Sequence, residues 1–411
     1  MKKTIIRLTQ KIFLYLLLFG ATDPAMAIEE ANTLPAHIQS FIWKSGSVSG
    51  LNYRYSSSGD LLPLSNFYAF RVDGNYIAQQ SKEAQAFIQV LNQMPGQLGD
   101  QLQLGTLVPE FKTELKYLAP IYSIGVNSKW TLAIGIPVFH YKNAVQFSSY
   151  GSNVADIQKQ AQGDISMLQQ GFQNLNRSLT QEVQTLIKEQ GYTIDNKNQW
   201  LLGDIQLASL FQIYETDSFK VLLKEILQLP TGPKDNPDDL LDLDFLGQTA
   251  LDTQLALQKW VHPQISFFGK LSYKWIFPDH LKKRVPQDKS DIFPGPETAE
   301  TVQRDPGDEA SAEIKALFKP KSYLLLEAGT AYTQKAKETY KGGGTKNYAL
   351  LNLEAASWTR LILGAELSTI SWFKKKIFSI PLLLSYHFND IFQGSNKERQ
   401  TIHEISLSVF F

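Results

Sequence analysis

The sequence predicts an all-β fold, a transmembrane antiparallel β-barrel of about 12 to 14 strands with a helical insertion. Three observations lead to this prediction. The chain starts with a basic and apolar leader, its central part alternates apolar with polar residues, and its last residues repeat that alternation. A barrel in the outer membrane of a Gram-negative cell accounts for all three.

The leader covers residues 1–27. Lys2, Lys3 and Arg7 precede an apolar run at 12–21, which is followed by the small-residue sequence Ala25-Met26-Ala27. This order is typical of a secretory signal peptide, and we expect cleavage near Ala27. A transmembrane anchor is the alternative, but it needs about 20 apolar residues, roughly twice the length of this run.

The composition excludes other classes of protein. Lys and Arg together number 40, as do Asp and Glu, and the formal net charge is +0. Removal of the leader takes away four basic residues and one acid, which leaves a net charge of about −3. Neither sign dominates, so we expect no nucleic-acid partner. The chain has no cysteine, so its core or the surrounding lipid must stabilise it without disulfides.

The barrel is predicted to occupy residues 47–411. In the segment 248–261, Leu251, Leu255 and Leu257 share one face, whereas Asp252 and Gln254 share the other. Several such segments reach ten residues or more, which suits a tilted bilayer crossing better than a β-sandwich, whose strands usually have about 5 or 6 residues. Tryptophans lie mostly at the ends of these segments, where interfacial girdles occur: Trp130, Trp200, Trp260, Trp275, Trp358 and Trp372.

The last segment, Thr401–Phe411, is predicted to be the closing strand. Ile405, Leu407 and Val409 alternate with polar residues up to Phe411, so we expect these apolar side chains to face lipid. The pattern resembles the C-terminal signal by which bacterial outer-membrane proteins are recognised for assembly. The expected partners are therefore outer-membrane lipid and, through this strand, the barrel-assembly machinery.

Three segments depart from the alternation. Residues 28–46 are predicted to be an N-terminal plug or leader segment, because Phe41 and Trp43 favour burial. Apolar residues recur every three or four positions over about 153–190, which predicts an amphipathic helical insertion at the barrel mouth, either a packed loop helix or a lid. Residues 278–313 are rich in charge, Pro and Gly, and are predicted to be a long extracellular loop without chemistry.

Strand parity nominates residues of the lumen, because a charge on the lipid face costs a few kcal/mol. One interpretation is a closed interior held by ion pairs, with Arg360 paired to Glu354 or Glu366; the other is a conduit that these side chains line. Leu210, Ile362, Leu383 and Phe410 are apolar candidates on the inward parity. The candidate ligand-binding or lumen-lining residues are Asp204, Asp252, Glu354, Arg360, Glu366 and His387, with Glu327 and Glu404 on the same parity.

A family resemblance appears in residues 203–232 and 247–275. A Gly203-Asp204 strand start, a return strand ending in Leu229-Pro230-Thr231-Gly232, and an Asp252-bearing strand after Gly247 follow one another. This order resembles the outer-membrane family linked to phenol meta-pathway degradation, which is related to the long-chain fatty acid (FadL-type) transporters. The resemblance implies passive uptake of small hydrophobic or aromatic ligands without a cofactor.

No motif indicates catalysis. The six histidines are scattered, and neither a GxSxG nor an HExxH sequence occurs, so we predict no enzyme, no catalytic residue and no metal. Two alternatives to a passive transporter stay open: a structural or adhesive barrel that transports nothing, and a hydrolase whose site is assembled across strands.

Overall fold

The computed structural model describes residues 31–411 except 79–81, 162–170, 173–183, 186, 243–245, 289–290, 292–293 and 345. The predicted signal peptide and most of the predicted helical insertion at 153–190 lie outside the described residues.

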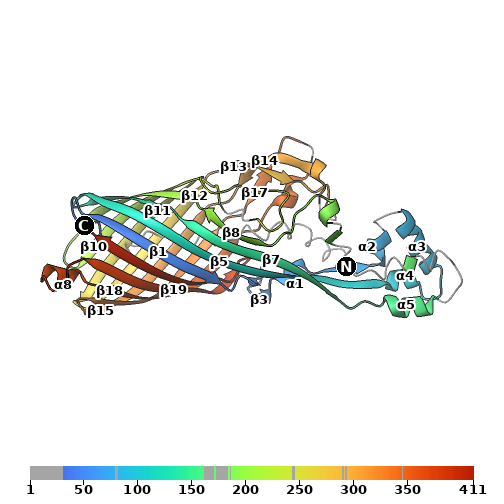
Figure 1. Cartoon of the computed structure of the whole chain (residues 1–411), viewed down its shortest axis with the longest axis horizontal. Coiled ribbons are helices and arrows are strands. Elements are labelled where there is room, and N and C mark those ends of the chain that lie inside the picture. Colours follow the sequence, from blue (N-terminus) through green and yellow to red (C-terminus); the bar gives the residue numbers. More distant parts are fainter. Residues whose placement is uncertain are drawn as a thin grey trace.

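Twelve antiparallel strands close into a barrel (Figure 1). The barrel prediction is confirmed, with the strand number at the lower end of the expected range. Closure comes from β1, which pairs with β20 on one side and with β5 on the other. The order around the wall is β1 (Gln39–Ser49), β20 (Thr401–Phe410), β19 (Leu382–Ser395), β18 (Ala356–Ser368), β16 (Leu324–Lys335), β15 (Glu309–Lys321), β12 (Ile265–Ile276), β11 (Ala250–His262), β10 (Phe219–Leu229), β9 (Ile205–Glu215), β6 (Trp130–Gly135) and β5 (Gln103–Asn127).

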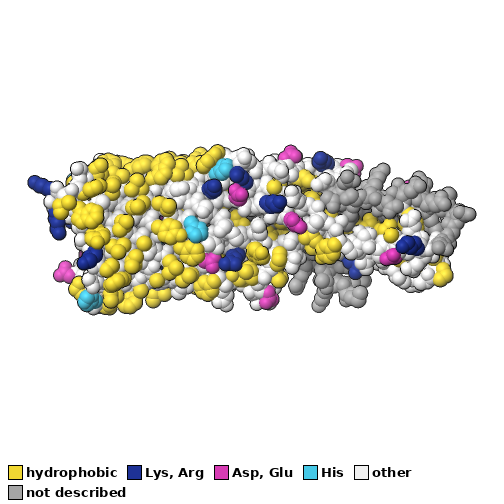
Figure 2. Space-filling model, turned by 60° about the horizontal axis from the view of Figure 1, so that its bottom comes forward, with side chains coloured by type: hydrophobic (Ala, Val, Ile, Leu, Met, Phe, Trp, Pro, Cys, Tyr) yellow, Lys and Arg dark blue, Asp and Glu magenta, His cyan; other side chains and the backbone are white. Residues whose placement is uncertain are grey.

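Exposure alternates along the wall strands, as a barrel in lipid requires. In β20 the side chains of Glu404 and Ser406 are buried in the lumen, whereas Ile405 and Leu407 are exposed. Figure 2 shows the result, a broad hydrophobic band over the barrel. The predicted parity of the last strand is therefore confirmed, and the band supplies the lipid-facing belt.

The two ends of the barrel differ in the length of their connections. Short turns at 128–129, 216–218, 263–264 and 322–323 lie at the end that carries the last residue, together with α8 (Ile370–Lys374). Long connections such as 50–102 and 277–308 lie at the other end. Outer-membrane barrels have short periplasmic turns and long extracellular loops, so the end with α8 is periplasmic.

One side of the wall continues beyond the barrel. β5 has 25 residues; its second half pairs with β6, and its first half pairs with β7 (Val138–Tyr150), which pairs in turn with β8 (Lys197–Leu202). The ladders are interrupted at Pro137, which has no N–H to donate, and at Gly203-Asp204.

The far end of this extension is a separately packed unit, here called the arm (Figure 1). Its core includes Leu91, Leu102 and Ile157, all nearly inaccessible. It comprises the outer ends of β5 and β7 with β4 (Phe70–Asp73), α2 (Gly74–Ala78), α3 (Lys82–Asn92), α4 (Leu98–Gln101) and α5 (Val154–Gln160). The start of the predicted insertion thus lies in the arm, away from the barrel mouth.

The segment predicted as a charged loop at 278–313 is folded, which corrects that prediction. Leu281, Val302 and Tyr340 belong to a small core under a three-stranded sheet. The local sequence hides this sheet because its third strand comes from a distant segment. The sheet consists of β13 (Asp279–Arg284), β14 (Ala299–Asp305) and β17 (Thr339–Lys341), with η2 (Pro296–Thr298) and η3 (Tyr348–Leu351), and residues 309–313 already belong to β15.

A second correction concerns residues 28–46, predicted to be a plug or leader. Residues 39–49 form the wall strand β1, whose Lys44 and Ser40 occupy the lumen face and disguise the apolar alternation. Residues 31–34 do lie against the inner wall, where Gln258 and Thr131 accept hydrogen bonds from the N–H groups of Ala31 and Leu34. The other elements are β2 (Tyr53–Tyr55), β3 (Leu61–Pro63) and α1 (Ser65–Tyr68).

Candidate functional site in the barrel lumen

A band of paired charges, here called the charged belt, crosses the lumen about halfway along the strands. Strand parity turns each side chain inward, and the pairing register brings them to one level. Its members are Lys44, Tyr117, Lys270, Glu313, Lys315, Glu327, Arg360, His387 and Glu404.

Glu313 is the centre of the larger part of the belt. Its carboxylate lies 3.2 Å from the Lys270 ammonium and 3.3 Å from the Arg360 guanidinium. Lys315 lies 3.5 Å from Glu313 and 3.0 Å from Glu327, whose other oxygen is 2.9 Å from His387 Nδ1. Removal of one partner from such a buried set leaves an uncompensated charge, so the members depend on one another.

A second part of the belt crosses the closing strands. Lys44 lies 3.1 Å from Glu404, whose other oxygen accepts a hydrogen bond of 2.5 Å from the Tyr117 hydroxyl. Glycine makes room for these side chains: a Cβ at Gly46 would lie 2.3 Å from the Tyr117 ring. A Cβ at Gly364 would likewise lie 2.5 Å from Glu327 Oε1. The belt therefore needs glycine on the neighbouring strands.

The predicted site residues separate into different places. Arg360 and His387 belong to the charged belt, and Asp252 is buried in the lumen, where it accepts a hydrogen bond from Gln254. Glu366 lies nearer the periplasmic end, where it lines a cavity. Glu354 is wrong as a lumen residue, because its side chain is 73% exposed in the connection after β16, 3.5 Å from Lys337.

The predicted ion pairs of Arg360 are also wrong. The partner of Arg360 is Glu313 rather than Glu354 or Glu366. Sequence reasoning missed Glu313 because it falls in the segment taken for a loop, and missed Lys44 because it falls in the segment taken for a plug. Lys270 and Lys315 had a usable signal, since each lies on the same parity as other polar residues of its strand, such as Ser272 and Ser311.

Asp204 holds the point where the extended wall meets the barrel. Its Oδ1 accepts hydrogen bonds from the N–H groups of Gly232 and Gly247, at 2.8 and 3.0 Å. Its Oδ2 accepts hydrogen bonds from the N–H of Gln248 and from Gln228 Nε2, at 3.2 and 2.8 Å. The Gly-Asp and Leu-Pro-Thr-Gly residues of the family resemblance thus form one knot around this carboxylate.

Apolar side chains fill the lumen on the periplasmic side of the belt. They form a buried cluster with Ala31 of the N-terminal segment: Ile42, Ile121, Ala208, Leu210, Leu222, Ile226, Ala256, Phe268, Leu317 and Leu325. Beyond it lies a cavity of about 450 Å³, here called the periplasmic cavity. Leu34, Ile42, Leu325, Leu383 and Phe410 contribute its apolar lining, and Lys319, Glu366 and Lys374 its charges.

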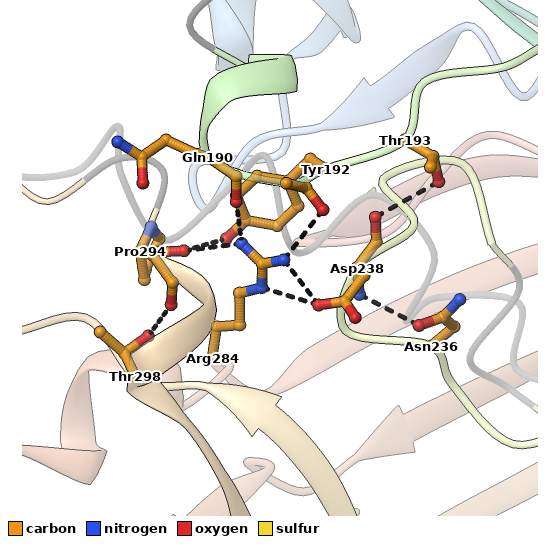
Figure 3. A network of polar contacts seen from close by, with 10 residues as sticks. Gln190, Tyr192, Thr193, Asn236, Asp238, Arg284, Pro294 and Thr298 are labelled. Atoms are coloured by element: carbon orange, nitrogen blue, oxygen red, sulfur yellow. Dashed lines mark hydrogen bonds and ion pairs between the residues drawn. The ribbon is translucent and has the colours of Figure 1, made fainter.

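The extracellular side is covered by connections that Arg284 joins (Figure 3). The guanidinium Nε and Nη2 donate to Asp238 Oδ1 at 2.8 and 2.6 Å, and Nη1 donates to the carbonyls of Gln190 and Pro294. Arg284 lies 3.9 Å from the ring centroid of Tyr192, and burial raises the pKa of that phenol above its ordinary value. One arginine thus fastens three connections over the barrel mouth.

Near these connections lies a narrow apolar pocket of about 20 Å³. Its lining comes from the root of the arm and from two of the connections, and includes Tyr68, Phe70, Phe111, Phe147, Ile187 and Leu240. Among the described residues, no three His, Asp or Glu side chains are placed to hold a metal ion. No helix within the described ranges is both long and apolar enough to cross a membrane.

The fold is similar to that of an outer membrane channel from Pseudomonas putida F1. The TM-score is 0.51 at 12% sequence identity, over 94% of this chain and 100% of that chain. The chain has the fold of an outer-membrane channel. This fold, the closed barrel and the hydrophobic band place the protein in the outer membrane, whereas cleavage near Ala27 stays a prediction.

Two further solved structures align at lower scores. A FadL homologue of Pseudomonas aeruginosa has a TM-score of 0.31 at 11% identity, over 92% of this chain and 90% of that chain. The toluene transporter TbuX of Ralstonia pickettii has a TM-score of 0.35 at 8% identity, with the same coverage. These TM-scores are too low to support any conclusion about this protein. No family model and no curated protein matches the sequence.

Proposed function

We propose that this protein is a passive outer-membrane channel for small hydrophobic or aromatic compounds. The observation that carries the proposal is the periplasmic cavity. Its volume of about 450 Å³ falls in the range of ligand sites, about 300 to 1,000 Å³, and such sites combine apolar walls with a few polar groups. Glu366, predicted as a lining residue, is one of those polar groups.

The lumen supports passage of an apolar molecule better than passage of an ion. The periplasmic cavity would hold the compound before its release. On the extracellular side of this cavity lies the charged belt, whose carboxylates are already paired with cations. A hydrated ion would have to displace these partners, which is costly in a buried network. Asp204, Asp252, Arg360 and His387, which the sequence predicts as ligand-binding or lumen-lining residues, are part of this proposal as residues that contact the ligand.

The test compares two tryptophan substitutions on neighbouring residues of β19. Leu383 lines the periplasmic cavity, whereas Leu384 is 44% exposed on the lipid face. Leu383→Trp should fill the cavity and slow the uptake of labelled naphthalene by cells at least severalfold. Leu384→Trp adds the same ring outside the lumen and should leave uptake unchanged, because Trp is tolerated on the lipid-facing surface.

Cells without the protein give the baseline for this test. Equal uptake in all four strains, with the folded barrel present at the cell surface, would overturn the channel proposal. An equal reduction by both tryptophan variants would mean that the cavity is not on the path. Hydrolysis of an ester or peptide panel by the purified protein would favour the enzyme alternative.

The arm favours one competing function. It extends beyond the barrel on the side opposite the C-terminus (Figure 1), where it could contact another surface. A structural or adhesive role predicts that removal of the arm abolishes attachment of the cells. It also predicts that naphthalene uptake, with or without the arm, equals that of cells without the protein. The channel proposal predicts transport of naphthalene by the intact protein. Recognition of β20 by the barrel-assembly machinery remains a prediction.

A further inference from the structure

The periplasmic rim carries an unpaired group of lysines. Lys319 and Lys321 lie at the end of β15, just before the turn to β16, and Lys374, Lys375 and Lys376 follow one another after β18. All five are exposed, and none forms an ion pair with another described residue. Residues 318–323 and 368–382 contain no Asp or Glu, although Glu366 shares the lining of the periplasmic cavity with Lys319 and Lys374. We call this group the basic rim.

Contacts between the two segments make the basic rim one surface. Ser322 Oγ lies 3.3 Å from Ser371 Oγ, and the rings of Tyr323 and Trp372 lie 5.1 Å apart. The N–H of Ser368 also donates to the carbonyl of Tyr323 at 2.9 Å. The lysines of both segments therefore face the same region beside β15, β16, β18 and β19.

The segment after α8 has a defined shape. The N–H of Ile377 donates to the carbonyl of Trp372, and the N–H of Lys376 donates to that of Phe373. These two bonds form a Schellman motif, in which the residue at Lys376 adopts a left-handed conformation and is usually glycine. Here the position holds a lysine at φ 59°, which is strained relative to glycine. A lysine thus occupies a position whose backbone conformation favours glycine, the residue without a side chain.

The neighbouring residues place the basic rim beside lipid. Phe373, Ile377 and Phe378 are exposed, with Ile377 at 71%. The segment that carries them connects β18 to β19, whose paired residues Leu367 and Leu384 are exposed in the lipid-facing belt. Exposed aromatic and aliphatic side chains next to lysines are typical of the membrane–water interface, where the apolar groups enter the bilayer and the ammonium groups remain at headgroup level.

The basic rim lies on one side of this end of the barrel, whereas the turn between β5 and β6 carries a single exposed lysine, Lys129. The turn between β9 and β10, at the same end, carries Asp217, and Glu215 before it pairs with Lys220 after it at 2.7 Å. Figure 2 shows Lys or Arg side chains projecting past the hydrophobic band at the end where Figure 1 places α8. Lysines near a bilayer surface attract anionic lipid, and clusters of them read as lipid-binding patches.

We propose that the basic rim binds the phosphate headgroups of acidic phospholipids in the periplasmic leaflet of the outer membrane. The apolar side chains after α8 seat the segment in that leaflet, and the five lysines contact headgroup phosphates from two adjacent turns. A periplasmic acidic protein would also match the charge, but continuity with the lipid-facing belt favours lipid. This inference does not depend on the proposed transport function.

Native mass spectrometry of the folded barrel in detergent tests the proposal. The probes are phosphatidylglycerol and phosphatidylcholine with identical acyl chains. The wild type should retain phosphatidylglycerol at least tenfold more strongly than phosphatidylcholine. The variant K374Q/K375Q/K376Q should lose most of this preference, whereas K374R/K375R/K376R should keep it because the charge remains.

A matched variant controls for net charge. K282Q/K337Q/K341Q removes three exposed lysines from the extracellular end and should retain the phosphatidylglycerol preference. Equal retention of both lipids by the wild type would overturn the proposal, as would an equal loss of preference in the two glutamine variants. K376G gives an independent check on folding, because glycine suits the left-handed position and should leave the barrel folded.

Discussion

Asp204 illustrates at the residue scale how one side chain fixes distant backbone. Its carboxylate accepts hydrogen bonds from three N–H groups and from Gln228, and it joins the start of β9 to the connection between β10 and β11. Thr231 adds to the same knot, since its hydroxyl donates to the carbonyl of Gly203 and accepts from the N–H of Ile205. Gly247 has φ 73° there, a conformation that favours glycine.

Replacement of this carboxylate should be costly. In Asp204→Asn the amide nitrogen faces N–H donors and the charge-assisted bonds are lost, so we expect the free energy of unfolding to fall by about 2 to 4 kcal/mol. A urea titration measures this free energy, with the fraction of folded barrel read from its shifted mobility on a gel. Asp217→Asn, at an exposed turn, is the control. A loss of the same size in both variants would contradict the assigned role.

Lys397 gives a pH dependence outside the membrane-spanning strands. It is 1% exposed, and its Nζ lies 4.5 Å from the ring centroid of Trp358. Burial lowers the pKa of Lys397 from its usual 10.5 to about 8, against the opposing effects of Glu398 and Glu309. Between these two values the unfolded chain binds more protons than the folded chain, so stability must rise with pH.

The contribution of Lys397 is measured against Lys397→Met. The free energy of unfolding of the wild type, minus that of the variant, should increase by about 1.4 kcal/mol per pH unit between roughly pH 8 and 10.5. Urea titrations at several pH values give this difference, and Lys337→Met provides an exposed reference. A difference that stays flat or falls with pH would refute the lowered pKa.

At the scale of elements, the arm has a core of its own. Leu91 on α3 and Leu102 before β5 are 0% exposed, and they pack in a different cluster from the apolar side chains of the lumen. The long strands β5 and β7 connect the two units by backbone pairing. The arm should therefore open without unfolding of the barrel, because local opening follows separate packing units.

A core truncation in the arm tests this independence. Leu91→Ala should cost about 3 kcal/mol within the arm, through lost burial and the cavity that remains. Limited proteolysis should then cut the arm, while the barrel keeps its folded mobility on a gel. Gln89→Ala, on the exposed face of the same helix, should leave the digestion pattern unchanged. Simultaneous loss of arm and barrel would show that they unfold as one unit.

For the whole molecule, the lengths of the connections determine the orientation. The turns 128–129, 216–218, 263–264 and 322–323 lie at the end with α8, whereas the three-stranded sheet and the arm lie at the other (Figure 1). The chain has no cysteine, so a single introduced thiol reports its own side of the membrane.

This orientation predicts a labelling pattern in intact cells. Gly343→Cys, in the connection between β17 and η3, should react with a membrane-impermeant maleimide. Asp217→Cys, in the turn between β9 and β10, should react only after the outer membrane is permeabilised. The reverse labelling pattern would show that the barrel has the opposite orientation, with the basic rim on the outside of the cell.

The sequence by itself determined which face of most wall strands meets lipid, because side-chain alternation is a local property with a period of two residues. It therefore predicted the inward position of His387 and Arg360 and the outward position of Leu407. Only the tertiary structure decided the strand number, the arm and the partners in the charged belt. Lys44 and Glu404 are 360 positions apart, and their contact exists because β1 and β20 close the barrel. The alternation along a strand determines which face a side chain occupies, whereas the pairing register around the closed wall determines which side chain lies beside it.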